Sequence, residues 1–337
     1  MGCKKLIAKV KCFFVAIGVL LIGAPVVVAA ELPLIEAVKA GDGNTVRSLL
    51  ANGDAVDSSE PDGTTALHWA AHHNHEDIAR LLLAAGATVD AVNRYEVTPL
   101  ALAALNGSAG MIEGLLEAGA DPNRQNPEGE TPLMTAARTG NRLALTVLLE
   151  HGAAVDAIEA WRGQTALMWA VAQNQVDAVD VLLRAGADPN ARSTGGFTPI
   201  LFAAREGYLD VLDALVRAGA NVDDVVPSSG MSALVMSVYN AHYDFAKGLL
   251  AAGANPDAAD NGWSALHQVV WTRRPNLGRN PPFPVPHGEL DAFDLVRALA
   301  DAGANLDIRQ TKEPQFSNVE KAAKKTNSLS RSCVTRF

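Results

Sequence analysis

The side chains best suited to chemistry are four histidines that lie close together in the sequence: His68, His72, His73 and His75. His68 and His72 are four residues apart, so on a helix they would lie one turn apart, the spacing at which two imidazoles can bind one metal ion. No carboxylate pattern nearby completes a ligand set. The sequence therefore predicts no metal site.

The short motifs that build most catalytic centres are absent from the sequence. There is no Gly-x-Ser-x-Gly, no His-Glu-x-x-His, no glycine-rich phosphate loop and no cysteine with a plausible base partner. The acids Asp177, Asp180, Asp210 and Asp213 fall where the outer surface of helices is expected, so solvated charge explains them. We predict that the protein is not an enzyme and uses no cofactor.

The N-terminal segment has the order of a secretory signal. Four lysines in the first eleven residues precede an apolar run from Phe13 to Gly23, and small residues end the segment at Ala30. We expect a signal peptide over 1–30, cleaved after Ala30, and a periplasmic or secreted protein. The alternative is an uncleaved anchor over 13–30, which is barely long enough to span a bilayer. Cys333 would then be the only cysteine of the mature chain, which excludes an internal disulfide.

The charge balance argues against nucleic acid as a partner. The full chain has a formal net charge of −9, and without residues 1–30 it has 24 basic and 37 acidic residues, a net charge of −13. Binding to phosphate backbones requires clustered lysine and arginine. We expect no nucleic-acid partner, and a monomer.

One motif recurs along the rest of the chain and predicts the elements that must position any site. It reads Thr-Ala-Leu or Thr-Pro-Leu, and about twenty residues later an apolar run is closed by Gly-Ala. A period of this length is typical of a solenoid. The motif begins at Thr65, Thr98, Thr131, Thr165, Thr198, Ser232 and Ser264, with spacings of 33, 33, 34, 33, 34 and 32 residues. The closing glycines are Gly53, which ends a degenerate first copy, then Gly86, Gly119, Gly152, Gly186, Gly219, Gly253 and Gly303.

Each copy is expected to form two short helices. The Thr or Ser hydroxyl can cap the first helix, and Pro99, Pro132 and Pro199 stand at its first position, where a missing N–H costs nothing. The closing glycine can adopt the left-handed conformation that ends the second helix. Paired alanines such as Ala70 and Ala71 let neighbouring helices approach closely. One such copy is too thin to bury its apolar face, so stability must come from stacking.

These residues resemble the ankyrin-repeat family, whose copies contain Thr-Pro-Leu-His-x-Ala-Ala and end in Gly-Ala-Asp-x-Asn. Gly119-Ala120-Asp121-Pro122-Asn123 and Gly186-Ala187-Asp188-Pro189-Asn190 match that ending. The resemblance covers about 31–310 and implies an all-α solenoid of about eight helix-turn-helix copies with hairpin loops, used to bind proteins. It also places His68 at a structural, hydrogen-bonding position. The copies run over 31–61, 62–94, 95–127, 128–161, 162–194, 195–228, 229–260 and 261–310.

Two segments depart from the array. The eighth copy contains a proline-rich insert over 272–289, which is a basic island on an acidic chain. The insert is either a tolerated extension of a loop tip or a second contact site, with Arg273, Arg274, Arg279 and Phe283 as its contact residues. The basic tail over 311–337 lacks the repeat pattern. It is a weak candidate for a terminal cap, or the product of truncation or a frameshift.

In the family, partners contact the hairpin tips and the end of the first helix on a concave face. We expect large side chains at the tips to be contact residues, because Trp, Tyr, Met and Arg are enriched in interface hot spots. Packing between adjacent hairpins is the alternative explanation for them. Trp69, Trp169 and Phe202 are instead expected in the core. The tip candidates are Arg94, Tyr95, Val97, Trp161, Arg162, Gln164, Phe197, Met231 and Trp263. The helix candidates include His72, His73, Leu105, Arg138, Gln173, Arg205, Glu206, Tyr239 and Asn240.

The leading hypothesis is a non-enzymatic scaffold that binds a protein or peptide on its concave face. A second hypothesis is an accessory or inhibitory subunit of an exported enzyme. A third is a hydrolase whose active-site residues follow no recognised motif.

Overall fold

The structure, a computed structural model, describes residues 32–260, 263–272, 285 and 288–307. The expected signal segment 1–30, the tail 311–337 and the insert residues Arg273, Arg274, Arg279 and Phe283 lie outside these ranges. The chain divides into two units, Met1–Leu32 and Pro33–Phe337, and the second is described here. Its described residues include no helix that combines the length and the apolar character needed to cross a bilayer.

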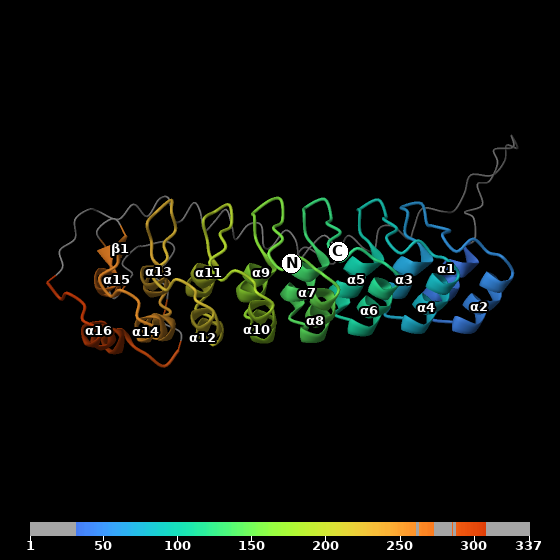
Figure 1. Ribbon diagram of the computed structural model, residues 1–337. Helices are drawn as coiled ribbons and strands as arrows, with labels where there is room; N and C mark the ends of the chain where they lie inside the picture. The colour runs from blue at the N-terminus through green and yellow to red at the C-terminus, as the bar shows by residue number, and fades with distance from the viewer. Residues whose placement is uncertain (1–31, 261–262, 273–284, 286–287, 308–337) are drawn as a thin grey trace, which may run out of the picture. The chain divides into compact units, whose positions relative to one another are not determined.

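The second unit is built from short helices that alternate between two rows (Figure 1). The first row holds the odd-numbered helices, which are α1 (Pro33–Lys39), α3 (Ala66–His72), α5 (Pro99–Asn106), α7 (Pro132–Thr139), α9 (Ala166–Ala172), α11 (Pro199–Glu206), α13 (Ala233–Tyr239) and α15 (Ala265–Thr272). The second row holds the even-numbered helices, which are α2 (Gly43–Ala51), α4 (Glu76–Ala84), α6 (Ala109–Glu117), α8 (Arg142–Glu150), α10 (Val176–Arg184), α12 (Leu209–Arg217), α14 (Tyr243–Ala251) and α16 (Ala292–Asp301).

Each odd-numbered helix packs against the even-numbered helix that follows it, and each helix also packs against its neighbours in its own row. The core lies between the two rows. In the second pair, for example, Leu67 and Ala71 of α3 and Ile78 and Leu82 of α4 are buried. Because each copy packs against its neighbours along the array through both of its helices, the helical solenoid predicted from the repeat is confirmed.

Local sequence signals set the helix ends as expected. The Thr98 side chain accepts a hydrogen bond from the Ala101 amide at the start of α5, and Pro99 occupies the first helical position. Gly86, just beyond α4, has a φ of +89°, a left-handed value that other residues adopt only at a cost. Thr198 is the exception to the capping pattern, because its side chain makes no capping bond to α11.

Hairpin loops leave the row of odd-numbered helices on the side away from the even-numbered helices (Figure 1). The one between α14 and α15 contains two short antiparallel strands, β1 (Ala259–Asp260) and β2 (Trp263–Ser264). Isolated bridges at Ser59–Thr65 and Val225–Ser232 mark two other hairpins.

A ladder of Asp and Asn side chains ties each copy to the next at the base of the hairpins. In each step, a side-chain oxygen accepts a hydrogen bond from a backbone amide of the following copy. The step from Asp257 to the Asn305 amide measures 2.8 Å and crosses the insert, so the last helix pair is docked like the others. The other steps join Asp57 to Thr88, Asp90 to Asp121, Asn123 to Ala154, Asp156 to Asp188, Asn190 to Asn221, and Asp223 to Asn255.

Candidate protein-binding surface

The hairpin tips present two large aromatic side chains to solvent. Tyr95 is 64% exposed and Trp161 is 58% exposed, and Arg94 beside Tyr95 is also exposed. Tyrosine and tryptophan are among the commonest anchors of protein interfaces. That Arg94, Tyr95 and Trp161 contact a partner remains a prediction.

Glu159, which sequence reasoning missed, holds the hairpin that carries Trp161. Glu159 is only 4% exposed. Its carboxylate accepts hydrogen bonds from the backbone amides of Trp161 at 2.6 Å, Arg162 at 2.7 Å and Gln164 at 3.1 Å. Three donors satisfy the buried anion and fix the path of the tip. A signal for this role exists in the sequence, because Asn93 and Asn126 occupy the corresponding places at intervals of 33 residues and accept amide hydrogen bonds in the same way.

Adjacent hairpins are joined to one another through their backbones. The Arg94 amide donates to the carbonyl of Asp62 at 2.6 Å, the Ala160 amide to Glu128 at 3.0 Å, and the Thr194 amide to Arg162 at 2.7 Å. These bonds join the first hairpin to the second, the third hairpin to the fourth, and the fourth to the fifth. They limit the motion of those tips, which reduces the entropy lost when a partner binds.

Arginines lie over aromatic rings where the odd-numbered helices face away from the even-numbered row. The Arg138 guanidinium carbon of α7 lies 5.3 Å from the ring centroid of Trp169 on α9. Arg205 of α11 lies 5.1 Å from the Phe202 ring and 5.7 Å from the Phe197 ring. These cation–π contacts hold both arginines in place while each remains half-buried. We call this surface, formed by the solvent-facing sides of α3 to α13 and the hairpin tips, the odd-helix face.

Three tip candidates from the sequence prove to be packing residues. Met231 is 6% exposed and Trp263 is 7% exposed, so neither lines a binding edge, and the expectation that they do is wrong. The Trp263 ring packs against the Trp271 ring with centroids 5.4 Å apart. Val97 is half-buried at the foot of its hairpin, where its carbonyl accepts a hydrogen bond from His68 at 2.9 Å. The burial of Met231 and Trp263 agrees with a packing role, and the ring that Trp263 contacts belongs to α15 of the same copy.

Two residues expected in the core lie partly on the surface instead. Trp69 and Trp169 are half-buried on the odd-helix face, whereas Phe202 is 4% exposed, as expected. The Trp69 indole N–H donates to the Glu60 carboxylate at 3.0 Å, and the Lys39 ammonium lies 4.7 Å from its ring centroid. These two tryptophans add apolar area to the candidate surface.

The remaining helix candidates also lie on the odd-helix face. Tyr239 at the end of α13 is half-buried, and so are Leu105 of α5 and Glu206 of α11. Arg162 is half-buried behind the exposed Trp161, with its guanidinium carbon 5.9 Å from the indole centroid.

The histidine cluster divides into one structural residue and a surface group. The buried His68 ring is 2.8 Å from the Thr65 hydroxyl through Nδ1 and 2.9 Å from the Val97 carbonyl through Nε2, so both nitrogens are used. Because a carbonyl can only accept, Nε2 carries the proton, and burial lowers the pKa of the imidazole. The rings of His72 and His73 instead pack around Trp69, with centroids 5.7 and 5.5 Å away. His68 and His72 therefore do not share a ligand position.

Within the described ranges, no three His, Cys, Asp or Glu side chains gather closely enough to hold a metal ion. A hollow of about 540 Å³ between α8 and α10 is lined by Arg142, Thr146, Val181 and Arg184, among others. It lies on the even-numbered row, away from the hairpins, and the Thr146 hydroxyl donates to the Arg142 carbonyl rather than to a base. This hollow has no arrangement of nucleophile and base.

Comparison with known proteins agrees with this architecture. The family description "Ankyrin repeats (3 copies)" matches residues 34–126, 115–193 and 200–278. The crystal structure of the human ASB11 ankyrin repeat domain is similar, with a TM-score of 0.60 and 30% sequence identity over 66% of this chain and 99% of that chain. The ankyrin repeat domain of Bcl-3, described as a unique member of the IkappaB protein family, gives a TM-score of 0.56 and 30% identity over 61% and 93%. No curated protein sequence matches the chain significantly. The chain belongs to the ankyrin-repeat family.

Proposed function

We propose that this protein is a non-enzymatic scaffold that binds a protein or peptide on its odd-helix face. Ankyrin repeats are in general protein–protein interaction modules, and the chain carries them over most of its length. The observation that supports this particular face is the exposure of Tyr95 and Trp161 at hairpin tips whose backbones are already fixed by hydrogen bonds. Rigid aromatic anchors bind with a small entropic cost.

We further propose that the protein acts outside the cytoplasm. The support is the order of residues 1–30, in which a basic end, an apolar run and small residues follow one another. Protein purified from its native cells should then begin at Glu31, as read by N-terminal sequencing. An N-terminus that retains residues 1–30 on soluble cytoplasmic protein would refute this localisation.

The binding role is tested by removing both tip aromatics at once. Proteins captured by the immobilised full chain from an extract of its native cells are compared with those captured by the Tyr95→Ala/Trp161→Ala variant. A partner that uses these anchors should be retained at least tenfold less by the variant, because hot-spot aromatics cost about 2 kcal/mol or more when truncated. Quantitative mass spectrometry of the captured proteins gives the ratio.

Leu143→Ala is the matched control. Leu143 lies at the start of α8 on the even-numbered row and is 67% exposed. The substitution therefore removes a comparably exposed apolar side chain from the other row of helices. The control should retain the partner as the unsubstituted chain does. Equal capture by all three proteins, with circular dichroism unchanged, would refute the proposed face.

A further inference from the structure

Arg138 stands out because its charge is fixed in place without a carboxylate partner. Its guanidinium makes no hydrogen bond and no ion pair with any described residue, although the side chain is half-buried over the Trp169 ring. Arg205 is different, since it is paired with Glu206 at 2.7 Å. Arginines that are ordered but unpaired are suited to binding a carboxylate supplied by another molecule.

Glu130 is the carboxylate whose charge reaches Arg138, and it does not neutralise the guanidinium by contact. Glu130 is half-buried and accepts a hydrogen bond from Asn126 at 3.3 Å. Burial raises the pKa of Glu130, and the charge of Arg138 offsets only part of that effect. Glu130 thus forms a hydrogen bond within its hairpin and no ion pair with Arg138.

Charge is distributed unevenly between the two rows of helices. Among the odd-numbered helices, only α1 and α11 carry acids, Glu36 and Glu206, whereas most even-numbered helices carry one or two. Exposed charges more than about 8 Å apart are largely screened at physiological salt. The acids of the even-numbered helices therefore have little electrostatic effect on Arg138. The helices α7 and α9 themselves therefore present an arginine and a tryptophan and no acid, and Glu130 of the hairpin before α7 is the carboxylate whose charge reaches Arg138.

The indole of Trp169, over which Arg138 lies, has an unsatisfied donor. Its Nε1 is buried and has no hydrogen-bond acceptor among the described residues. An unsatisfied buried donor is rare in native proteins and costs free energy.

We propose that Arg138 and Trp169 form a subsite for an aspartate or glutamate side chain of a partner polypeptide lying across α5, α7 and α9. This inference rests on the proposed function and assigns the chemistry of part of the same face. Leu102 and Leu105 of α5 are half-buried and occupy the places that Thr135 and Arg138 occupy on α7, 33 residues later, so an apolar partner residue is expected beside the acid. Neighbouring helices in a row pack about 8–10 Å apart, so about three extended residues separate the two partner side chains.

The test selects peptides from a random 16-residue phage library against the immobilised full chain. Selected peptides are synthesised with a fluorophore, and their affinities are measured by anisotropy for the unsubstituted chain and for Arg138→Gln, Arg138→Lys and Arg142→Gln. Arg142 is exposed on α8 and serves as the matched control. Circular dichroism establishes that each variant is folded.

We expect the selected peptides to be enriched in Asp or Glu. Their affinity should be about tenfold or more lower for Arg138→Gln, because losing a hydrogen bond to a charged group weakens binding by about this factor. Arg138→Lys should recover part of the loss, and Arg142→Gln should change nothing. Replacing the peptide acid by its amide should cost as much as Arg138→Gln, and the two changes together should cost no more than either alone.

Two results would overturn the proposal in distinguishable ways. Peptides that lose affinity for Tyr95→Ala/Trp161→Ala but bind Arg138→Gln normally would refute the acidic subsite and leave the proposed face intact. A selection that yields no binder, or only peptides that bind all of these variants equally, would count against both the acidic subsite and the proposed binding face.

Discussion

Glu159→Ala is expected to lower the free energy of unfolding by about 2–3 kcal/mol, the largest effect we predict for a residue outside the apolar core. The substitution removes the acceptor of three backbone amides, those of Trp161, Arg162 and Gln164, in a place that is only 4% exposed. Buried donors left without a partner cost about 1–3 kcal/mol each, and partial hydration of the loosened tip reduces the total. Urea unfolding followed by circular dichroism measures the change.

The same substitution should also weaken partner binding, although Glu159 itself is buried. Its carboxylate positions Trp161 and Arg162, so a loosened hairpin must be ordered again when a partner binds. Glu159→Gln keeps one acceptor oxygen and should lose roughly half as much stability. Glu128→Ala, on the exposed tip of the preceding hairpin, is the control and should change stability by less than about 0.5 kcal/mol. Equal stability of Glu159→Ala and Glu128→Ala would contradict this account.

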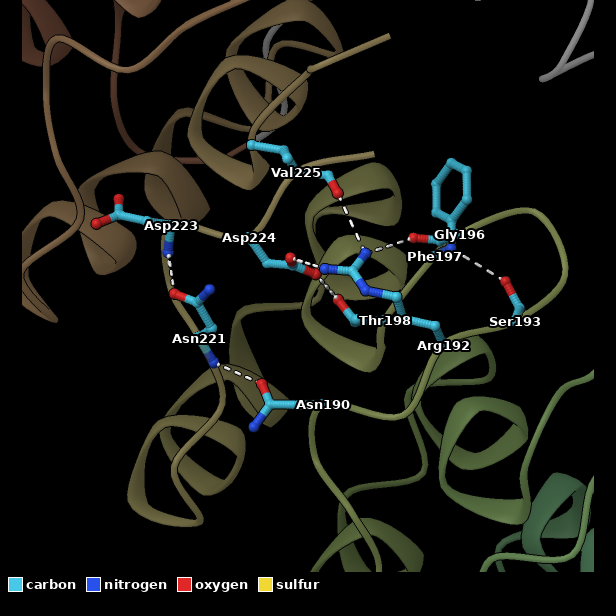
Figure 2. Close-up of polar contacts among 10 residues, drawn as sticks. All are labelled: Asn190, Arg192, Ser193, Gly196, Phe197, Thr198, Asn221, Asp223, Asp224 and Val225. Atoms are coloured by element: carbon cyan, nitrogen blue, oxygen red, sulfur yellow. Dashed lines mark hydrogen bonds and ion pairs between the residues drawn. The ribbon is translucent and has the colours of Figure 1, made fainter. Parts of the chain in front are cut away.

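Asp224→Ala is expected to lower the free energy of unfolding by about 2 kcal/mol. Asp224 is 4% exposed, and its carboxylate accepts hydrogen bonds from the Arg192 guanidinium and, at 2.7 Å, from the Thr198 hydroxyl (Figure 2). Arg192 also donates to the carbonyls of Gly196 and Val225, so the network joins two successive hairpins. Removing one partner of a buried ion pair leaves the other charge without its partner, which costs free energy. The Arg192 side chain is 42% exposed, so water replaces part of the lost interaction.

Steric effects are not expected to contribute to this loss. Alanine already stands at the corresponding position of other copies, at Ala91, Ala157, Ala191 and Ala258, so the shorter side chain fits the hairpin. Asp213→Ala on α12 is the control. Its side chain is 83% exposed and its pair with Arg217 lies on one helix surface, so we expect less than about 0.5 kcal/mol. Urea unfolding that gives the same loss for both variants would refute a structural role for the network.

The fold could be predicted from the sequence because its signals are local and repeated. A capping hydroxyl at Thr98, a proline at Pro99 and a closing glycine such as Gly86 each act within one helix turn, and the structure shows each in the expected place. Repetition of the motif then implies stacking, since one copy cannot bury its own apolar face.

The binding surface was predicted less accurately because position within the hairpin decides exposure. Met231 and Trp263 stand directly before the capping serine and are buried, whereas Trp161 stands four residues before Thr165 and is exposed. Thr198 reads as an ordinary cap, but Asp224 from the next copy accepts its hydroxyl hydrogen bond. No pattern within one copy could show this bond, because its two residues lie 26 positions apart.

Amide hydrogen exchange of the full chain, with and without a bound selected peptide, is the measurement that tests the binding face most directly. We expect the peptide to slow exchange at the tips over 94–97 and 160–164 and in α5, α7 and α9, because these elements carry the exposed aromatics, Arg138 and Trp169. Slowed exchange confined to the even-numbered helices α4 to α14, with the tips unchanged, would contradict it.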